Sequence, residues 1–409
     1  MAHRYLLALP CLLVVACGSS GSGGSAGSSG SAGTTGNGGT TGAGNGLGTG
    51  GPFSFPQSKV SGSCTLTTVA NAATATMTAY SSWRSTYVVA GNPGMRVQRP
   101  ENGNDTVSEG IGYGMLAAVY IGDQATFDGL WTYAQAHFDT FTNTLMNWHI
   151  TSGGATASDG TGSATDGDED MIWALLMASD QWSSTTYLAA AQNMIEAMWG
   201  YSVFPDGSIQ NGDHWQDTDA LNPDYFSPAY YRVFAKATNR AAWGKLVIDA
   251  GYAHLAGVTG NNGLVPDESN LENSLAQSST ACPNCKPNYG YDACRTPWRI
   301  AMDYCFNGEA RALTYLQKIG PFFNSVSGGA GNIGDGYMQN GTATSSNHNS
   351  AFIGPAGTAG MAGYPTLLDG AFNFAVSNPG GNNSYFAQSL KVVTMLMMSG
   401  NFLDYSQLQ

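Results

Sequence analysis

Charged residues are scarce in this sequence. They make up 11% of the 409 residues, whereas an average globular domain has about 25%. The 15 Lys and Arg residues are outnumbered by 28 Asp and Glu residues, which gives a formal net charge of −13. This shortage of positive charge argues against nucleic acid as a partner. A neutral ligand that is rich in hydroxyl groups suits such a surface better.

The apolar run at the N-terminus is too short to span a bilayer. Residues 5–16 are mostly apolar and follow a short segment that contains Arg4, an arrangement typical of an export signal. Its end, Val14-Val-Ala-Cys17, resembles the lipobox of bacterial lipoproteins, which implies that Cys17 is acylated. A lipid there anchors a chain without crossing the membrane. We therefore expect a cell-envelope lipoprotein at the outer membrane or cell surface, or a released form, with an ordinary signal peptide as the alternative.

Residues 18–52 contain neither aromatic nor charged side chains and are almost entirely Gly, Ser, Thr, Ala and Asn. Such a segment cannot bury enough apolar surface to offset the entropy of ordering. We expect a signal peptide over 1–16, a flexible tether over 17–52 and one catalytic domain over 53–409. A domain of that length is large for a single core, which favours an architecture that repeats a unit around an axis.

Alternation typical of β-strands is also rare, and helical periodicity dominates. Residues 123–138 carry an apolar stripe with Asp123 as a plausible N-cap, and residues 187–199 carry a similar stripe. Residues 170–178, and those after Glu109 as far as Ile121, are apolar nearly all round, as helices buried on both sides are. This alternation of buried and one-faced helices predicts an all-α fold, an (α/α)6 barrel of six inner and six outer helices. A helical solenoid is the alternative, although no strict sequence period is visible.

Cysteines are few, and their pairing cannot be read from the sequence. Cys11 leaves with the signal, and the presumed lipid site takes a second cysteine. Of the remaining five, those in the cluster from 282 to 305 allow one or two disulfides after export. A zinc or redox site at Cys282-Pro-Asn-Cys285 lacks a second ligand pair, so we expect no metal. The five are Cys64, Cys282, Cys285, Cys294 and Cys305.

One carboxylate, Glu109, lies among small and apolar residues in the stretch 106–116. Burial raises the pKa of a carboxyl group, so the group can keep its proton near neutral pH, as general acid catalysis requires. The glycines at positions 110, 112 and 114 have no β-carbon and let a ligand or a packed helix approach the backbone. A Gly-rich turn with a solvent-facing Glu109 is the alternative.

Further acidic residues precede the buried helix that we expect to begin at Met171. Asp168, Glu169 and Asp170 are placed to cap this helix or to interact with its dipole, which gives them a structural explanation. Asp166 lies one turn earlier, beyond the reach of capping. We expect its side chain to project into the space that the barrel encloses, where it can hold a substrate hydroxyl or a developing positive charge.

A third acidic position lies in the stretch 288–299, which brings Tyr291, Asp292 and Arg295 to a junction between a loop and a helix. A surface ion pair between Asp292 and Arg295 is the simple alternative. Exposed pairs contribute only about 0–1 kcal/mol, and such a pair leaves the aromatic richness of the segment unexplained. We therefore favour a functional site.

Large aromatic residues also occur beside polar residues in expected loops. Trp148, Trp215 and Tyr225 are flanked by Asn, Asp, His or Gly, and each lies before an expected helix. Such rings stack on the apolar faces of sugars, while neighbouring polar groups bond to the hydroxyls. Each ring taken alone could equally belong to the core.

Three ordered segments carry a family resemblance: SEGIGYGM at 108–115, ATDGDEDM at 164–171 and YDACRTPWR at 291–299. Together they resemble glycoside hydrolase family 8. Residues 347–355 and 400–402 resemble later segments of that family, so the likeness covers nearly everything from about residue 54 onward. The resemblance implies an (α/α)6 barrel and inverting hydrolysis of β-1,4-linked polysaccharides, most often cellulose or related β-glucans.

The same resemblance implies roles for individual residues. Glu109 matches the general acid, Asp292 the general base, and Asp166 the aspartate that binds the distorted sugar at the cleavage point. The sequence departs from the cellulase-like branch at the Cys282 to Cys285 insert and at Phe386, where a tyrosine is expected. Residues matching those that line the substrate groove are Trp148, Trp215, Tyr225, Tyr291 and Arg295.

We therefore expect a monomeric endoglucanase without cofactor or metal. A family 8 xylanase or chitosanase is the alternative within the family. A lipid-tethered, non-catalytic carbohydrate-binding protein is the alternative from another class. A binder needs aromatic residues but no paired carboxylates, and all three acids are present here.

Overall fold

The computed structural model describes residues 51–215, 221–269, 287–378 and 384–408. The chain divides into a unit Met1–Gly44 and a unit Asn45–Gln409, and every described residue belongs to the second. The expected signal peptide and nearly all of the expected tether therefore lie outside the described residues.

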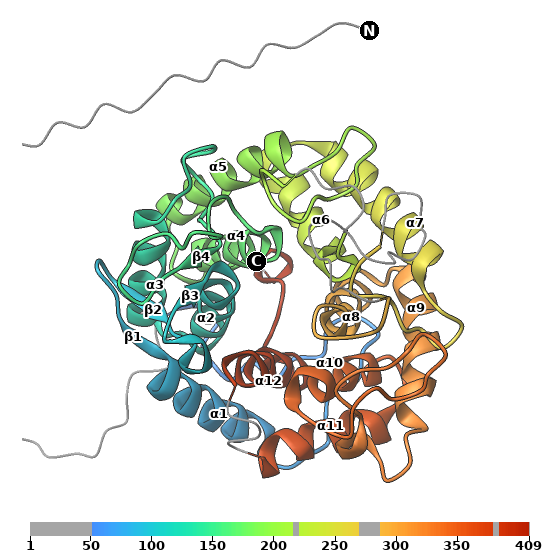
Figure 1. Cartoon of the computed structure of the whole chain (residues 1–409). Coiled ribbons are helices and arrows are strands. Elements are labelled where there is room, and N and C mark those ends of the chain that lie inside the picture. The colour runs from blue at the N-terminus through green and yellow to red at the C-terminus, as the bar shows by residue number, and fades with distance from the viewer. Residues whose placement is uncertain (1–50, 216–220, 270–286, 379–383, 409) are drawn as a thin grey trace, which may run out of the picture. The chain divides into compact units, whose positions relative to one another are not determined.

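Twelve α-helices occur in the part of the chain that the structure describes, together with only four strands of two or three residues. Figure 1 looks along the axis of the second unit and shows an inner ring of helices around the centre with further helices outside it. The expected (α/α)6 barrel is thereby confirmed. The inner helices are α2 (Ser108–Ile121), α4 (Thr165–Gln181), α6 (Pro228–Thr238), α8 (Thr296–Asn307), α10 (Ser350–Gly360) and α12 (Tyr385–Met398). The outer helices are α1 (Ala72–Tyr87), α3 (Gln124–Ala136), α5 (Thr185–Tyr201), α7 (Ile248–Val258), α9 (Ala310–Asn324) and α11 (Pro365–Ser377).

Burial follows the apolar periodicity of the sequence. Every residue of α10 is buried, and α2 and α12 are buried everywhere except at Glu109 and Phe386 respectively. The outer helix α5 instead buries a single stripe, and α3 begins behind Asp123, whose carboxylate accepts a hydrogen bond from the N–H of Thr126. No described helix has the combination of length and apolarity that crossing a membrane requires.

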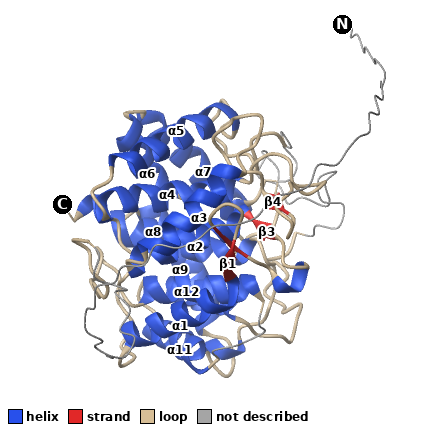
Figure 2. Ribbon diagram, turned by 90° about the vertical axis from the view of Figure 1, so that its left-hand side faces the viewer, coloured by secondary structure: helices blue, strands red, loops and turns tan. Residues whose placement is uncertain are grey.

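Two short antiparallel strand pairs brace the barrel. β1 (Val88–Ala90) pairs with β2 (Met95–Val97), and β3 (Thr106–Val107) pairs with β4 (His149–Ile150). β3 leads directly into α2, and the N–H of Ser108 donates to the carbonyl of Trp148 at 2.9 Å. Figure 2 shows β3 and β4 at one end of the barrel. The pairing therefore fixes the loop that carries Trp148 beside the start of α2.

Helix α4 begins earlier than the sequence indicates. It starts at Thr165 and not at Met171, so Asp166 lies in its first turn. The Gly-containing acidic stretch has low intrinsic helix propensity, but packing reverses that preference. A β-carbon on Gly167 would lie 2.7 Å from the carbonyl carbon of Ser108, because the first turns of α2 and α4 touch at this glycine.

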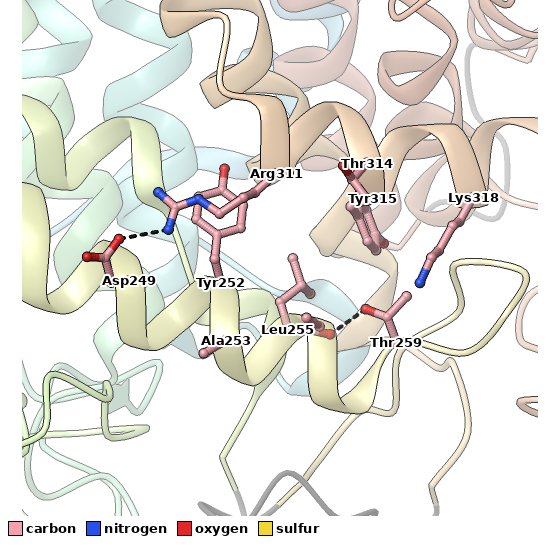
Figure 3. A pocket seen from close by; sticks show the side chains of 10 residues that line it. Asp249, Tyr252, Ala253, Leu255, Thr259, Arg311, Thr314, Tyr315 and Lys318 are labelled. Carbon is pink, nitrogen blue, oxygen red and sulfur yellow. Dashed lines mark hydrogen bonds and ion pairs between the residues drawn. The ribbon is translucent and has the colours of Figure 1, made fainter.

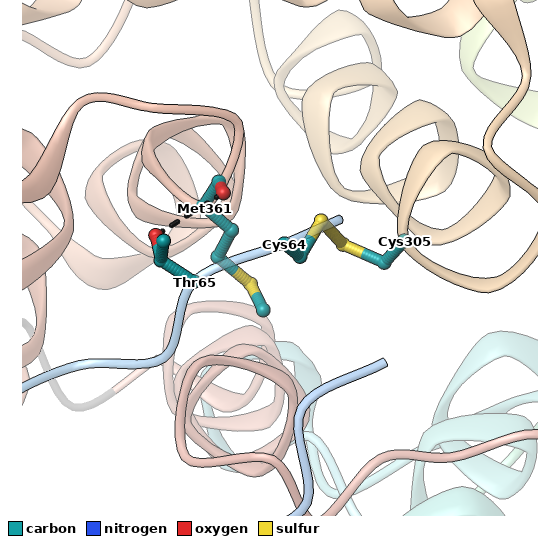
Figure 4. Close-up of a disulfide and its surroundings, with 4 residues drawn as sticks. All are labelled: Cys64, Thr65, Cys305 and Met361. Atoms are coloured by element: carbon teal, nitrogen blue, oxygen red, sulfur yellow. Dashed lines mark hydrogen bonds between the residues drawn. A yellow bond between two sulfur atoms is a disulfide. The ribbon is translucent and has the colours of Figure 1, made fainter. Parts of the chain in front are cut away.

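One disulfide ties the start of the domain to the inner ring. Cys64 is bonded to Cys305 of α8, 241 residues away, and the neighbouring Thr65 donates hydrogen bonds to the carbonyl of Met361 (Figure 4). Cys294 is a free, buried thiol. Cys282 and Cys285, considered above for zinc or redox chemistry, lie outside the described residues.

Replacing both bonded cysteines, Cys64→Ala with Cys305→Ala, should lower the free energy of unfolding by about 2–5 kcal/mol, because the cross-link restricts a long loop in the unfolded chain. Urea unfolding followed by tryptophan fluorescence measures the difference. Cys294→Ala is the matched control, since it removes a buried thiol without opening a disulfide. An unfolding midpoint of the double variant equal to that of this control would contradict the assignment.

Candidate active site

Each of the six inner helices supplies a polar side chain at or just before its N-terminal end. A helix N-terminus carries a partial positive charge, which favours carboxylates placed there. The six contributions are Glu109 of α2, Asp166 of α4, Asp224 in the turn η2 (Pro223–Tyr225) before α6, Arg295 in the turn η4 (Ala293–Arg295) before α8, Asn349 before α10, and Tyr385 of α12.

Arg295 joins four carboxylates. Its Nη1 lies 2.7 Å from Oε2 of Glu109 and 2.6 Å from Oδ2 of Asp166. Its Nε lies 2.7 Å from Oδ2 of Asp224, and its Nη2 lies 3.1 Å from Oδ1 of Asp292. The arginine side chain is only 2% exposed. Arg295 is thus a buried residue that four carboxylates share, and the alternative of a simple surface ion pair between Asp292 and Arg295 does not describe it.

Two aromatic rings flank the guanidinium of Arg295. Its central carbon lies 5.3 Å from the ring centre of Tyr225 and 5.8 Å from that of Phe386. These distances allow cation–π attraction. Tyr225 is only 9% exposed, so the structure places it against the arginine as well as near the carboxylates.

The structure brings Glu109 into an environment suited to a proton donor. Burial raises its pKa to about 7; Asp166 adds to the rise, while the charge of Arg295 and a hydrogen bond from Tyr385 oppose it. The Tyr385 hydroxyl donates to Oε1 of Glu109 at 2.6 Å. The Glu109 carboxyl group therefore exchanges its proton near neutral pH.

Asp292 lies on the open side of the same cluster. Its side chain is 42% exposed, whereas that of Asp166 is 5% exposed. Loss of hydration raises the pKa of Asp292, with Arg295 opposing the rise and Asp166 adding to it. A solvent-accessible carboxylate of raised basicity can accept a proton from water.

Exposed aromatic side chains lie near these acids. Tyr291, next to Asp292, is 51% exposed, and its hydroxyl donates to Oδ2 of Asp335 at 3.3 Å. Trp215 is 38% exposed and meets Trp148 edge-on at 6.3 Å between ring centres. The indole N–H of Trp148 donates to the carbonyl of Asp159 at 2.7 Å. These rings are thus held by neighbours and still reach solvent.

Sequence reasoning missed several residues of this site. Tyr385 had one available signal, because it adjoins Phe386, where the family resemblance calls for a tyrosine. Asp224 and Asp267 belong to loop segments without helical periodicity. Asn349 and Asp335 both form hydrogen bonds with the Tyr291 hydroxyl, and only the folded structure brings these three residues together.

A separate hollow of about 360 Å³ lies on the outer layer, between α7 and α9 (Figure 3). Its lining is mostly apolar, includes Tyr252, Leu255 and Tyr315, and shares no residue with the carboxylate cluster. Across the described residues, no group of three or more His, Cys, Asp or Glu side chains has an arrangement that could hold a metal ion.

Comparisons with known proteins agree with this geometry. The sequence is 36% identical over 330 residues to "Endoglucanase C" of Ruminiclostridium cellulolyticum, covering 78% of this chain and 70% of that one. It is 37% identical over 341 residues to "Endoglucanase A" of Acetivibrio thermocellus, with coverage of 78% and 68%. The solved beta-1,3-1,4-glucanase from Paenibacillus sp. X4 superimposes with a TM-score of 0.78 at 31% identity, covering 85% of this chain and 98% of that chain. The model of the family "Glycosyl hydrolases family 8" matches residues 53–400, and the chain therefore belongs to this family.

Proposed function

We propose that this protein is an endoglucanase that cleaves β-1,4-linked glucans, cellulose or mixed-linkage β-glucan, with inversion at the anomeric carbon. The observation that carries the proposal is the placement of Glu109 and Asp292 on the two terminal nitrogens of Arg295, one carboxyl largely buried and the other open to solvent. The endoglucanase and β-glucanase names of the relatives support the substrate class.

The reaction is a single displacement. Glu109 protonates the glycosidic oxygen, and Asp292 removes a proton from a water on the opposite face of the sugar. Inverting enzymes separate these two carboxyl groups by about 6.5–9.5 Å to leave room for that water. Asp166, fixed beside Glu109 by the shared Arg295, is placed to bind the sugar at the cleavage point.

A non-catalytic carbohydrate-binding protein would be a weaker explanation of this site. Such a protein needs the exposed rings of Tyr291 and Trp215 but gains nothing from burying charge. Burying ionised groups is costly, so a cluster of four carboxylates around one arginine requires a reason other than affinity. Proton transfer supplies that reason.

The purified domain should release reducing sugar from carboxymethylcellulose and lichenan faster than from xylan or chitosan.

Glu109→Gln should lower turnover by about 10²–10⁴-fold, because an amide cannot donate the proton, while binding of the glucan is retained. Initial rates and glucan-binding isotherms, measured side by side on the four polymers, test both statements.

The matched control is Glu196→Gln, a surface glutamate that pairs with Arg240. Its activity should equal that of the wild type.

Proton NMR of the first products should show the α-anomer. Release of the β-anomer would contradict inversion, and full activity of Glu109→Gln would reassign the acid.

Tyr385→Phe should move the basic limb of the kcat/KM profile to higher pH. The general acid is active when protonated, so activity falls as pH rises through the pKa of Glu109, which is about 7. The Tyr385 hydroxyl stabilises the ionised form. Its removal therefore raises this pKa, whereas the ring contact with Tyr87 is preserved in phenylalanine. A basic limb that stays in place or moves to lower pH would show that Tyr385 does not tune the acid.

We also propose that the mature protein is a lipoprotein anchored at Cys17. The tether that follows has an r.m.s. span of about 30–35 Å if it behaves as a Gly-rich coil, which lets the catalytic domain reach insoluble polymer from a membrane surface. The support is the sequence of the first 52 residues alone.

Cys17→Ala should abolish incorporation of labelled palmitate and release the protein from the membrane fraction of producing cells. Cys11→Ala is the control, because Cys11 lies within the expected signal and should leave labelling intact. Fractionation and autoradiography of both variants provide the measurement. Equal labelling of Cys17→Ala and wild type would refute the anchor.

A further inference from the structure

Asp267, in the loop that follows α7, organises the turn that carries Asp292. Its Oδ1 accepts hydrogen bonds from three backbone N–H groups, those of Gly290 at 2.9 Å, Asp292 at 3.2 Å and Ala293 at 2.9 Å. The N–H of Asp267 in turn donates to the carbonyl of Asn288 at 2.8 Å. One carboxylate thus holds the backbone of Asp292 and of a residue on each side of it.

The approach of Asp267 to this turn is as close as the backbone permits. A β-carbon on Gly290 would lie 2.2 Å from Oδ2 of Asp267, far inside contact distance. The backbone of Gly290 is not in the left-handed conformation, so backbone conformation does not explain why a glycine occurs at this position. The glycine is therefore matched to the carboxylate that packs against it.

Asp267 and Asp292 also interact electrostatically. The pKa of Asp267 is raised to about 7, mainly by burial and next by the charge of Asp292, while the three amides oppose the rise. Two carboxyl groups that interact in this way titrate as a pair. The other ionisable groups that face one or both members of the pair are Arg295, Asp166, Asp224, Glu109, Tyr225, Tyr289 and Cys294.

The three amide hydrogen bonds fix the backbone from which the Asp292 side chain projects. We propose that Asp267 is a positioning residue for Asp292, which holds the turn of the general base through these three amides. The proposal rests on the proposed role of Asp292 as general base.

Asp267→Ala removes the oxygen that the three amides bind, so kcat on lichenan should fall at least tenfold while KM stays within twofold of wild type. Asp267→Asn keeps an oxygen for these amides and should restore most of the lost kcat. Asp206→Ala is the matched control, since Asp206 is an exposed loop carboxylate that accepts one backbone N–H, and its kcat should not change.

Gly290→Ala tests the positioning without changing any charge. The added methyl group must displace the Asp267 carboxylate from the turn, so kcat should fall at least tenfold while KM changes little. This variant also carries the test if Asp267→Ala does not fold.

A wild-type kcat for Asp267→Ala, or for Gly290→Ala, would overturn the proposal. Asp292→Asn distinguishes this failure from failure of the proposed function. If Asp292→Asn loses turnover, the proposed role of Asp292 as general base stands and only the proposed role of Asp267 fails. If Asp292→Asn retains turnover, the proposed role of Asp292 fails as well.

Discussion

The site depends on one buried cation. Arg295 is almost fully enclosed and touches carboxylates from α2, α4, the turn before α6 and its own turn. Removing one partner of a buried ion pair costs about 3–5 kcal/mol, because the remaining charges lose their compensation. The ring of helices and the arrangement of acids are therefore held by the same contacts. A second buried pair, Arg299 with Asp170, repeats this linkage one turn further along α8 and α4.

The two principal carboxyl groups contact the same cation but differ in their access to solvent. Glu109 is held by Arg295 and Tyr385 in a largely buried position and has a pKa of about 7. Asp292 contacts the other terminal nitrogen of the guanidinium and remains open to solvent. Such differences in surroundings are how enzymes obtain an acid and a base from two carboxyl groups.

Much of this architecture could be predicted from the sequence. Helical periodicity located the inner helices α2 and α4 and the outer helices α3 and α5, and the isolated acids Glu109, Asp166 and Asp292 proved to lie around one arginine. The start of α4 was missed, since Gly167 and its acidic neighbours resemble a loop until α2 packs against them. Asp267 was missed for another reason, since its partners lie 23 to 26 residues away and periodicity does not record such pairs. Tyr385 bonds to Glu109 across 276 residues, and its one signal was the tyrosine that the family resemblance calls for at the adjacent Phe386.

The long sequence separations within the site have a consequence for folding. Glu109 is 186 residues from Arg295 and 276 residues from Tyr385, yet it bonds to both. Contacts of such high order form only after most of the chain has been arranged. The ring of helices must close before the site residues can meet, so a nascent or partly folded chain has separate helices and no assembled active site. Catalytic activity therefore requires that the last helix has packed against the first.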